Sequence, residues 1–129
     1  MKALLSLFLF INVSFISYAT NISTISQQQL LSLLNAPLAP DFMVLDVRSD
    51  DEFKAGHVQG AINISHDQIE QHLSKLTHFK NKIVIVYCRS GRRAKTAEAV
   101  LQANGFTLLR HLNGDYNAWL AADLPLIKE

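Results

Sequence analysis

Short apolar runs alternate with amphipathic segments from about residue 20 to the end of the chain. The apolar runs have the length and the β-branched residues that are typical of buried strands. We expect strands over residues 20–25, 42–45, 61–64, 82–87 and 106–112. The segments between them carry apolar side chains at helical spacing. Because strands and helices alternate, the pattern predicts an α/β domain with a central parallel sheet of about five strands and helices on both faces.

The predicted helices are bounded by residues that start and stop helices. Three capping-box pairs, each a serine followed three positions later by Gln or Glu, are expected to begin helices: Ser26 with Gln29, Ser49 with Glu52, and Ser65 with Gln68. The third helix should carry Ile69, Leu73 and Leu76 on one face. A longer helix over 94–104 is expected to end at Gly105 in a left-handed cap.

The start of the chain has a different pattern from the rest. Lys2 precedes a short apolar run, and Ser17 and Ala19 are small residues at the −3 and −1 positions of a cleavage site. The apolar run is shorter than the roughly 20 residues that a membrane-spanning helix needs. We therefore expect a signal peptide over 1–19 and a single domain over 20–129 with no stable membrane association after cleavage. An uncleaved N-terminal anchor is the alternative interpretation.

Composition and charge narrow the classes of partner and cofactor. The chain of 129 residues has room for one domain, and its formal net charge of +1 does not favour a nucleic-acid partner. Loss of Lys2 with the leader brings that charge to 0, and a small neutral domain is expected to be a monomer. A single cysteine excludes an internal disulfide. No metal site is expected, because His66, His72 and His78 are six residues apart and do not share a helix face.

The candidate chemistry lies where the apolar run over 83–86 meets a glycine-containing loop. Cys88 stands at the carboxyl end of this strand and just before a helix, where loop N–H groups and the positive end of the helix favour a thiolate over a thiol. Four cations follow before the first acidic residue: Arg89, Arg92, Arg93 and Lys95. The loop should therefore hold a nucleophile and attract a small anion. The alternative is that Cys88 is a small buried hydrophobic residue.

Three segments in succession resemble the signatures of the rhodanese family. The first comprises Asp46-Val47-Arg48 through Glu52-Phe53, Gly56-His57-Val58, Gly60-Ala61 and Asn63-Ile64. The second is Cys88-Arg89-Ser90-Gly91-Arg92-Arg93, running to Gly105-Phe106. The third comprises Leu112, Gly114, Ala118-Trp119 and Leu124-Pro125. The match spans nearly all of the expected mature chain. The chain is thus similar to a single-domain rhodanese, a thiosulfate sulfurtransferase of the exported bacterial kind, and the resemblance implies a rhodanese-like fold and a periplasmic location.

The resemblance also implies a two-step reaction without a metal or organic cofactor. Cys88 would take the outer sulfur of thiosulfate as a persulfide and pass it to a thiophilic acceptor, either cyanide or a thiol. The donor-binding residues would be those of the loop: Arg89, Ser90, Gly91, Arg92 and Arg93. The loop's N–H groups would hold the sulfur, and its arginines would bind the sulfonate end. Asp46 and Arg48 are assigned to a supporting pair that ties loops together or borders the substrate mouth.

Departures from the family pattern leave room for an altered substrate preference or reduced activity. Asp115 and Asp123 stand where the family commonly has glycine, and Ala94 stands where a serine often opens the helix. One alternative is a sulfur-carrier or protein-binding module that needs only the thiol. A cysteine phosphatase is the other alternative, but related phosphatases place an arginine after five intervening residues, a position that Ala94 occupies here. Tyr116 and Trp119 are expected to pack in the core.

Overall fold

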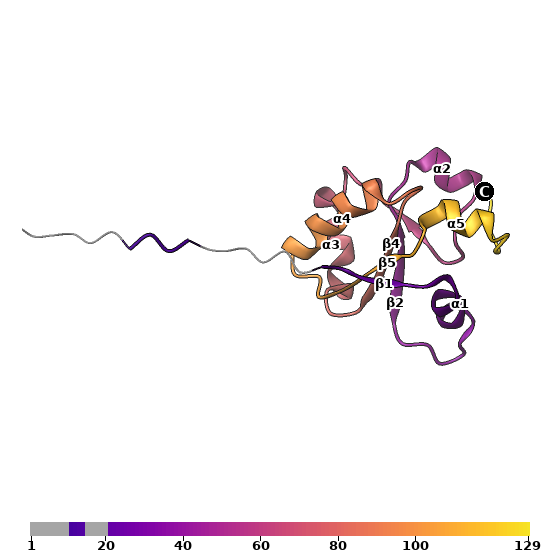
Figure 1. Cartoon of the computed structure of the whole chain (residues 1–129), viewed down its shortest axis with the longest axis horizontal. Helices are drawn as coiled ribbons and strands as arrows, with labels where there is room; N and C mark the ends of the chain where they lie inside the picture. The colour runs from indigo at the N-terminus through magenta and orange to yellow at the C-terminus, as the bar shows by residue number, and fades with distance from the viewer. Residues whose placement is uncertain (1–10, 15–20) are drawn as a thin grey trace, which may run out of the picture.

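The computed structural model of the chain describes residues 11–14 and 21–129. Its strands are β1 (Ser23–Ile25), β2 (Phe42–Asp46), β3 (Ile62–Asn63), β4 (Ile83–Tyr87) and β5 (Leu108–Leu112). Its α-helices are α1 (Gln27–Asn35), α2 (Asp50–Ala55), α3 (Leu73–Leu76), α4 (Arg92–Ala103) and α5 (Asp115–Ala121), and the short 3-10 helices η1 (Glu70–His72) and η2 (Thr77–Phe79) flank α3. Figure 1 shows these elements gathered around one sheet.

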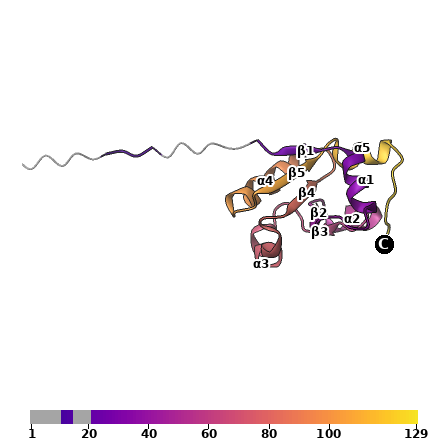
Figure 2. The same ribbon diagram turned by 90° about the horizontal axis from the view of Figure 1, so that it is seen from below.

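The strands form a single parallel sheet in the order β1-β5-β4-β2-β3. Strand β4 is central, with β2 on one side and β5 on the other. Helices α3 and α4 cover one face, and α1, α2 and α5 cover the other face (Figure 1, Figure 2). The predicted fold, an α/β domain with a five-stranded parallel sheet between two helical layers, is confirmed. In such sheets, sites lie at the carboxyl ends of the strands.

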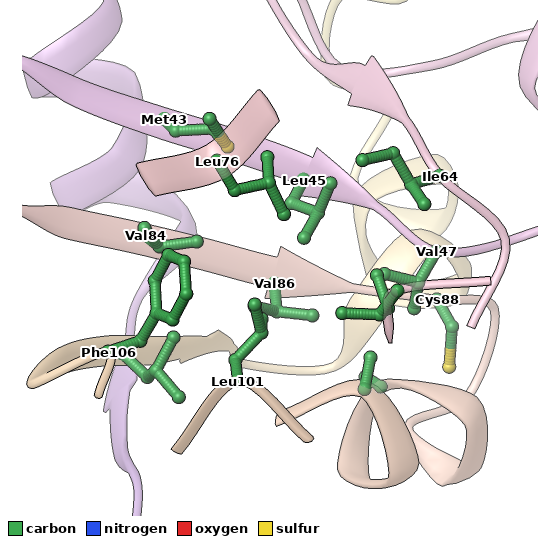
Figure 3. Packing of buried hydrophobic residues seen from close by; sticks show 14 residues of the cluster. Met43, Leu45, Val47, Ile64, Leu76, Val84, Val86, Cys88, Leu101 and Phe106 are labelled. Atoms are coloured by element: carbon green, nitrogen blue, oxygen red, sulfur yellow. The ribbon is translucent and has the colours of Figure 1, made fainter. Parts of the chain in front are cut away.

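The layer under α3 and α4 leads directly to the cysteine. Alternate residues along β2 and β4, and the residue just past each strand, point toward this layer: Met43, Leu45, Val47, Val84, Val86 and Cys88 (Figure 3). They pack against Leu101 of α4 and the adjacent Phe106. Each large apolar side chain buried in this way stabilises the fold by about 1.5–3 kcal/mol. Cys88 is the last member of its row, so it lies where the apolar core meets the carboxyl edge of the sheet.

Two of the three predicted capping boxes are present. Ser26 accepts a hydrogen bond from the N–H of Gln29 at 3.1 Å, and Ser49 accepts one from the N–H of Glu52 at 3.3 Å. The expected helix beginning at Ser65 is wrong. There the N–H of Gln68 donates to the backbone carbonyl of Ser65 at 2.8 Å, which closes a turn instead of a capping box. The segment then continues as η1, a four-residue α3 and η2, since no side chain caps the N-terminus of α3.

The glycine cap at the end of α4 is confirmed. Gly105 has φ of +88°, and the N–H of Phe106 donates to the carbonyl of Leu101 at 3.2 Å, as in a left-handed helix terminus. Asp115 and Asp123, which stand where glycine was expected, also have positive φ, at 54° and 53°. Residues other than glycine rarely adopt this conformation. At these two turns an aspartate therefore adopts a backbone conformation that favours glycine.

The predicted signal peptide lies outside the described residues except for 11–14, so it stays a prediction. Among the helices that the structure does describe, none has the length and apolar character needed to cross a membrane.

Candidate active site

The predicted site residues meet at the carboxyl edge of the sheet. Asp46 ends β2, Cys88 directly follows β4, and the turn after β5 leads into α5 at Asp115. Parallel pairing sets Asp46 beside Tyr87 and Val86 beside His111. The register therefore places polar residues of three neighbouring strands around the cysteine.

The loop from Cys88 to Gly91 folds back on its own sulfur. The N–H of Gly91 donates to the Sγ of Cys88 at 3.0 Å. Gly91 has φ of +111°, and this left-handed conformation turns the chain into α4. Cys88 is 1% exposed and packs with the core, while Ser90 is exposed on the loop. The thiol is thus buried, as its alternative interpretation expected, yet it accepts a loop N–H as a reactive sulfur would.

The helices on either side fix the loop further. The N–H groups of Tyr116 and Asn117, in the first turn of α5, donate to the carbonyls of Cys88 and Arg89 at 3.0 and 3.1 Å. At the other end of the loop, the first N–H groups of α4 have no partner within the helix and so favour a negative charge nearby. Ala94 lies fully buried in this turn.

The three loop arginines have different roles in the structure. Arg93 forms a two-pronged ion pair with Glu52 of α2, with Nη1 to Oε1 at 2.7 Å and Nη2 to Oε2 at 3.0 Å. The hydrogen bonds from Arg93 lower the pKa of Glu52 to about 2. Arg89 and Arg92 are exposed, and neither side chain has an ion-pair partner within residues 11–14 and 21–129. They are the cations available to an incoming anion, whereas Arg93 ties the loop to α2.

A hollow of about 260 Å³ opens beside the loop, between α2 and α5. It is lined by Arg48, Glu52, Arg89, Tyr116, Asn117 and Leu120, together with Ala55. Trp119 packs in the core as predicted. Tyr116 is only partly buried and also lines this hollow. The sequence did not predict that position, because the residues around Tyr116 indicate only a helix.

Asp46 and Arg48 form a buried pair on the β2 side of the cysteine, which we call the Asp–Arg pair. Arg48 donates through Nη2 to Oδ2 of Asp46 at 2.7 Å and to the carbonyl of Gly56 at 2.7 Å. Its backbone N–H also donates to Oδ1 of Asp46 at 2.9 Å. The guanidinium lies 3.9 Å from the ring centre of Tyr116, a cation–π contact. The pair joins β2 to the end of α2 and to α5.

A second ionic group on the β5 side was missed by the sequence reasoning. His111 lies between two buried carboxylates, with Nδ1 at 2.5 Å from Oε1 of Glu98 and Nε2 at 2.9 Å from Oδ2 of Asp115. These hydrogen bonds, first that to Asp115 and then that to Glu98, raise the pKa of His111 to about 10. We call these three residues the His111 cluster. Its only sequence signal was the aspartate in place of glycine at position 115.

Metal ligands do not gather at this edge of the sheet. Across the part of the chain that the structure describes, His, Cys, Asp and Glu side chains form no group of three or more suited to holding a metal ion.

Comparison with known proteins identifies the family. The profile of the rhodanese-like domain matches residues 26–122, and the chain belongs to this family. The tRNA uridine(34) hydroxylase of Wigglesworthia glossinidia brevipalpis is 35% identical over 78 residues, which cover 57% of this chain and 25% of that protein. The chain therefore spans about a quarter of the length of this curated relative.

Solved structures share the same fold. A protein from Anabaena sp. superposes with a TM-score of 0.72 at 26% identity, covering 81% of this chain and 82% of that one. The thiosulfate sulfurtransferase from Pseudomonas aeruginosa superposes with a TM-score of 0.70 at 28% identity, covering 84% of this chain and 20% of that one. Family and fold together support a sulfurtransferase-type enzyme.

Proposed function

We propose that this protein transfers the sulfane sulfur of thiosulfate to a thiol or cyanide through a persulfide on Cys88. The observation that carries the proposal is the 3.0 Å contact between the N–H of Gly91 and the Sγ of Cys88, at the carboxyl end of the central strand. A hydrogen-bond donor at this position stabilises negative charge on the sulfur. A persulfide on Cys88 would carry its charge on the outer sulfur, and we assign the stabilisation of that charge to N–H groups of the same loop.

The reaction balances without an external oxidant or reductant. The Cys88 thiolate attacks the outer sulfur of thiosulfate, a new S–S bond forms, and the S–S bond of thiosulfate breaks as sulfite leaves with the electron pair. The acceptor thiolate or cyanide then attacks the outer sulfur of the persulfide, and the Cys88 thiolate leaves. Each step passes through a sulfur anion, and the N–H groups of the loop and of the start of α4 stabilise its negative charge.

Arg89 and Arg92 are the residues we assign to the anionic end of the donor. Both are exposed at the loop, and Arg89 also lines the hollow beside it. A guanidinium can bind two oxygens of a sulfonate at once. Arg93 supports the site indirectly, because its side chain is already paired with Glu52. Ser90 and Gly91 contribute loop backbone.

Two other functions use the same thiol. A sulfur-carrier or protein-binding module would form the persulfide but turn over slowly. A cysteine phosphatase is disfavoured because Arg93 follows Cys88 after only four residues, which leaves a loop better suited to one sulfur atom than to a tetrahedral phosphate. We do not extend the tRNA chemistry of the hydroxylases to this chain, since they share only about a quarter of their length with it.

Location and assembly belong to the same proposal. We propose a periplasmic monomer that is released from its leader after Ala19, on the basis of the cleavage-site pattern and the near-neutral charge.

Intact-mass measurement tests the proposed function directly. The purified protein, incubated with thiosulfate and desalted, should gain the mass of one sulfur atom, and cyanide should remove it. Cys88→Ser should gain nothing. If the wild type shows no gain, thiosulfate transfer is excluded, and hydrolysis of p-nitrophenyl phosphate that depends on Cys88 would then favour the phosphatase. A persulfide that forms once but turns over only with a protein acceptor would favour the carrier.

A further inference from the structure

The His111 cluster lies outside the donor-binding loop but bears on it at two points. Oδ1 of Asp115 accepts the backbone N–H of Cys88 at 3.0 Å. Oδ2 of the same carboxylate lies against Gly91, since a β-carbon placed on that glycine would be 3.2 Å from it. One carboxylate therefore binds one end of the segment that is closed by the hydrogen bond from Gly91 to the sulfur, and it lies beside the other end.

Asp115 can bind one end and lie beside the other only if its side chain keeps one orientation. It is 3% exposed, and at the start of α5 it has φ of 54°, a conformation that glycine adopts without strain. Its second oxygen is held by Nε2 of His111 at 2.9 Å. Both carboxylate oxygens of Asp115 have hydrogen-bond partners. A residue that keeps such a side chain at a strained backbone position indicates a functional role for that side chain.

His111 is itself oriented from the opposite side. Glu98, which is 3% exposed on α4, holds Nδ1 at 2.5 Å and so fixes the ring. The raised pKa of His111, about 10, means that both ring nitrogens carry protons at neutral pH and donate to both carboxylates. The chain of contacts thus runs from α4 through His111 to α5 and ends at the backbone of Cys88.

We propose that His111 is a positioning residue for sulfur transfer: held by Glu98, it orients Asp115, which keeps the loop from Cys88 to Gly91 in the shape that brings an N–H to the sulfur. The proposal rests on the proposed function, and the residue acts through Asp115 without touching the donor. Arg89 and Arg92 lie outside the cluster, so binding of thiosulfate is expected to change little when His111 is replaced.

His111→Gln is the primary variant, and Glu98→Ala is the second in case the first does not fold. We expect persulfide formation in a single turnover to slow by roughly tenfold or more in each, as for a small misplacement of a reacting group, while KM for thiosulfate stays within about twofold. Glu98→Gln should stay near the wild-type rate, because its amide oxygen still accepts from Nδ1. This conservative variant provides the rescue.

A matched control separates positioning from general loss of stability. Leu30→Ala removes a fully buried side chain of α1 on the other face of the sheet, which belongs to neither the loop nor the His111 cluster. Amide NMR spectra of wild type and variants supply a readout that does not depend on turnover. The Cys88 and Gly91 amide signals should shift in His111→Gln and Glu98→Ala and stay in place in Leu30→Ala and Glu98→Gln.

Three results decide the matter. Unchanged persulfide formation and unchanged Cys88 and Gly91 signals in His111→Gln and Glu98→Ala would overturn the proposal. A rate that falls only as far as it does in Leu30→Ala would overturn it too, because the role would then be structural. Absence of a persulfide on the wild type would overturn the proposed function instead, and the amide signals would still show whether His111 holds the loop.

Discussion

Two buried ionic groups stand on either side of the central strand β4, and they are built in opposite ways. On the β2 side, Asp46 and Arg48 are two positions apart and 0% and 2% exposed, and their hydrogen bonds join β2 to the end of α2, although Arg48 also lines the hollow beside the loop. On the β5 side, Glu98, His111 and Asp115 come from three elements, and one carboxylate reaches the backbone of Cys88. The first group joins elements to one another, whereas the second joins an element to the reactive loop.

Charge differs between the two groups as well. The Asp–Arg pair is neutral as a unit, and its guanidinium also satisfies the carbonyl of Gly56. The His111 cluster has two carboxylates for one imidazolium, so it keeps a surplus negative charge below the loop. Exposed Arg89 and Arg92 offset that surplus from outside. We therefore expect changes on the β2 side to act on stability and changes on the β5 side to act on stability and on sulfur chemistry together.

Asp46→Ala should give the largest loss of stability. It leaves the guanidinium of Arg48 buried without its carboxylate, and breaking a buried pair in this way costs about 3–5 kcal/mol in the free energy of unfolding. Urea denaturation followed by circular dichroism measures the loss. The double variant Asp46→Leu with Arg48→Met removes both charges and should lose less than the single variant. Equal losses in the two variants would contradict the view that the unpaired charge is the cause.

The Asp–Arg pair is also the group that the sequence made visible. Its residues are separated by one position at the end of an apolar run, so strand geometry and local spacing were enough to join them. The same holds for the capping boxes at Ser26 and Ser49, where both partners lie within one turn of helix. Local pairs of this kind depend on few residues and can be read from the sequence. The fold class can also be predicted, because it follows from the order of strands and helices along the chain.

The His111 cluster depends on register and on packing between layers, which local patterns do not contain. His111 meets Glu98 only because β5 pairs with β4 while α4 crosses above them, and 13 positions separate the two residues. Arg93 meets Glu52 across 41 positions for a similar reason. The sequence therefore pointed to the loop that we propose carries the chemistry, but it contained no sign that Arg93 pairs with Glu52 of α2. It also assigned a capping role to Ser65, where a backbone turn forms.

Of the two ionic groups, only the His111 cluster should lose its contribution to stability at alkaline pH. Because the pKa of His111 is raised from 6.5 to about 10 by Asp115 and Glu98, its contribution to stability is fully present below about pH 6.5 and is lost as pH rises through 10. We expect a fall in the free energy of unfolding on the order of 2–4 kcal/mol across this range. Denaturation at a series of pH values measures it, and His111→Gln should show a flatter curve. A parallel curve in that variant would assign the fall to other groups.

Gly91→Ala should separate the strain of the loop from its contact with the His111 cluster. A methyl group on Gly91 would lie 3.2 Å from Oδ2 of Asp115, in addition to the cost of φ at +111°. Gly60→Ala is the matched control, since Gly60 has φ of +76° and no atom within 4 Å of the added methyl group. Gly60→Ala should lose about 1–2 kcal/mol, and Gly91→Ala about 1–3 kcal/mol more. Persulfide formation should fall only in Gly91→Ala. Similar losses in the two variants would show that the Asp115 carboxylate can move away from the added methyl group without lowering the free energy of unfolding.

Glu52→Gln should have the smallest effect on stability and still act on the loop. Gln keeps the capping box with Ser49 through its one oxygen, so the change removes the charge that pairs with Arg93 and the second acceptor oxygen of that ion pair. Because the pKa of Glu52 is lowered from 4.5 to about 2, the stability from this pair is present above about pH 4.5 and is lost as pH falls toward 2. The pair is partly exposed, so its loss at neutral pH should cost less than about 1 kcal/mol.

The same variant tests whether α2 holds the reactive loop through Arg93. Once released, this side chain becomes a third free cation at the loop, and KM for thiosulfate should change by roughly twofold or more, as a charge near a binding anion does. Asp50→Asn breaks the exposed pair with Lys54 on the same helix and provides the control. Its KM should equal that of the wild type. If Glu52→Gln and Asp50→Asn give the same KM, the pairing of Arg93 with Glu52 has no influence on the donor, and anchoring of the loop rests on α5 and the His111 cluster alone.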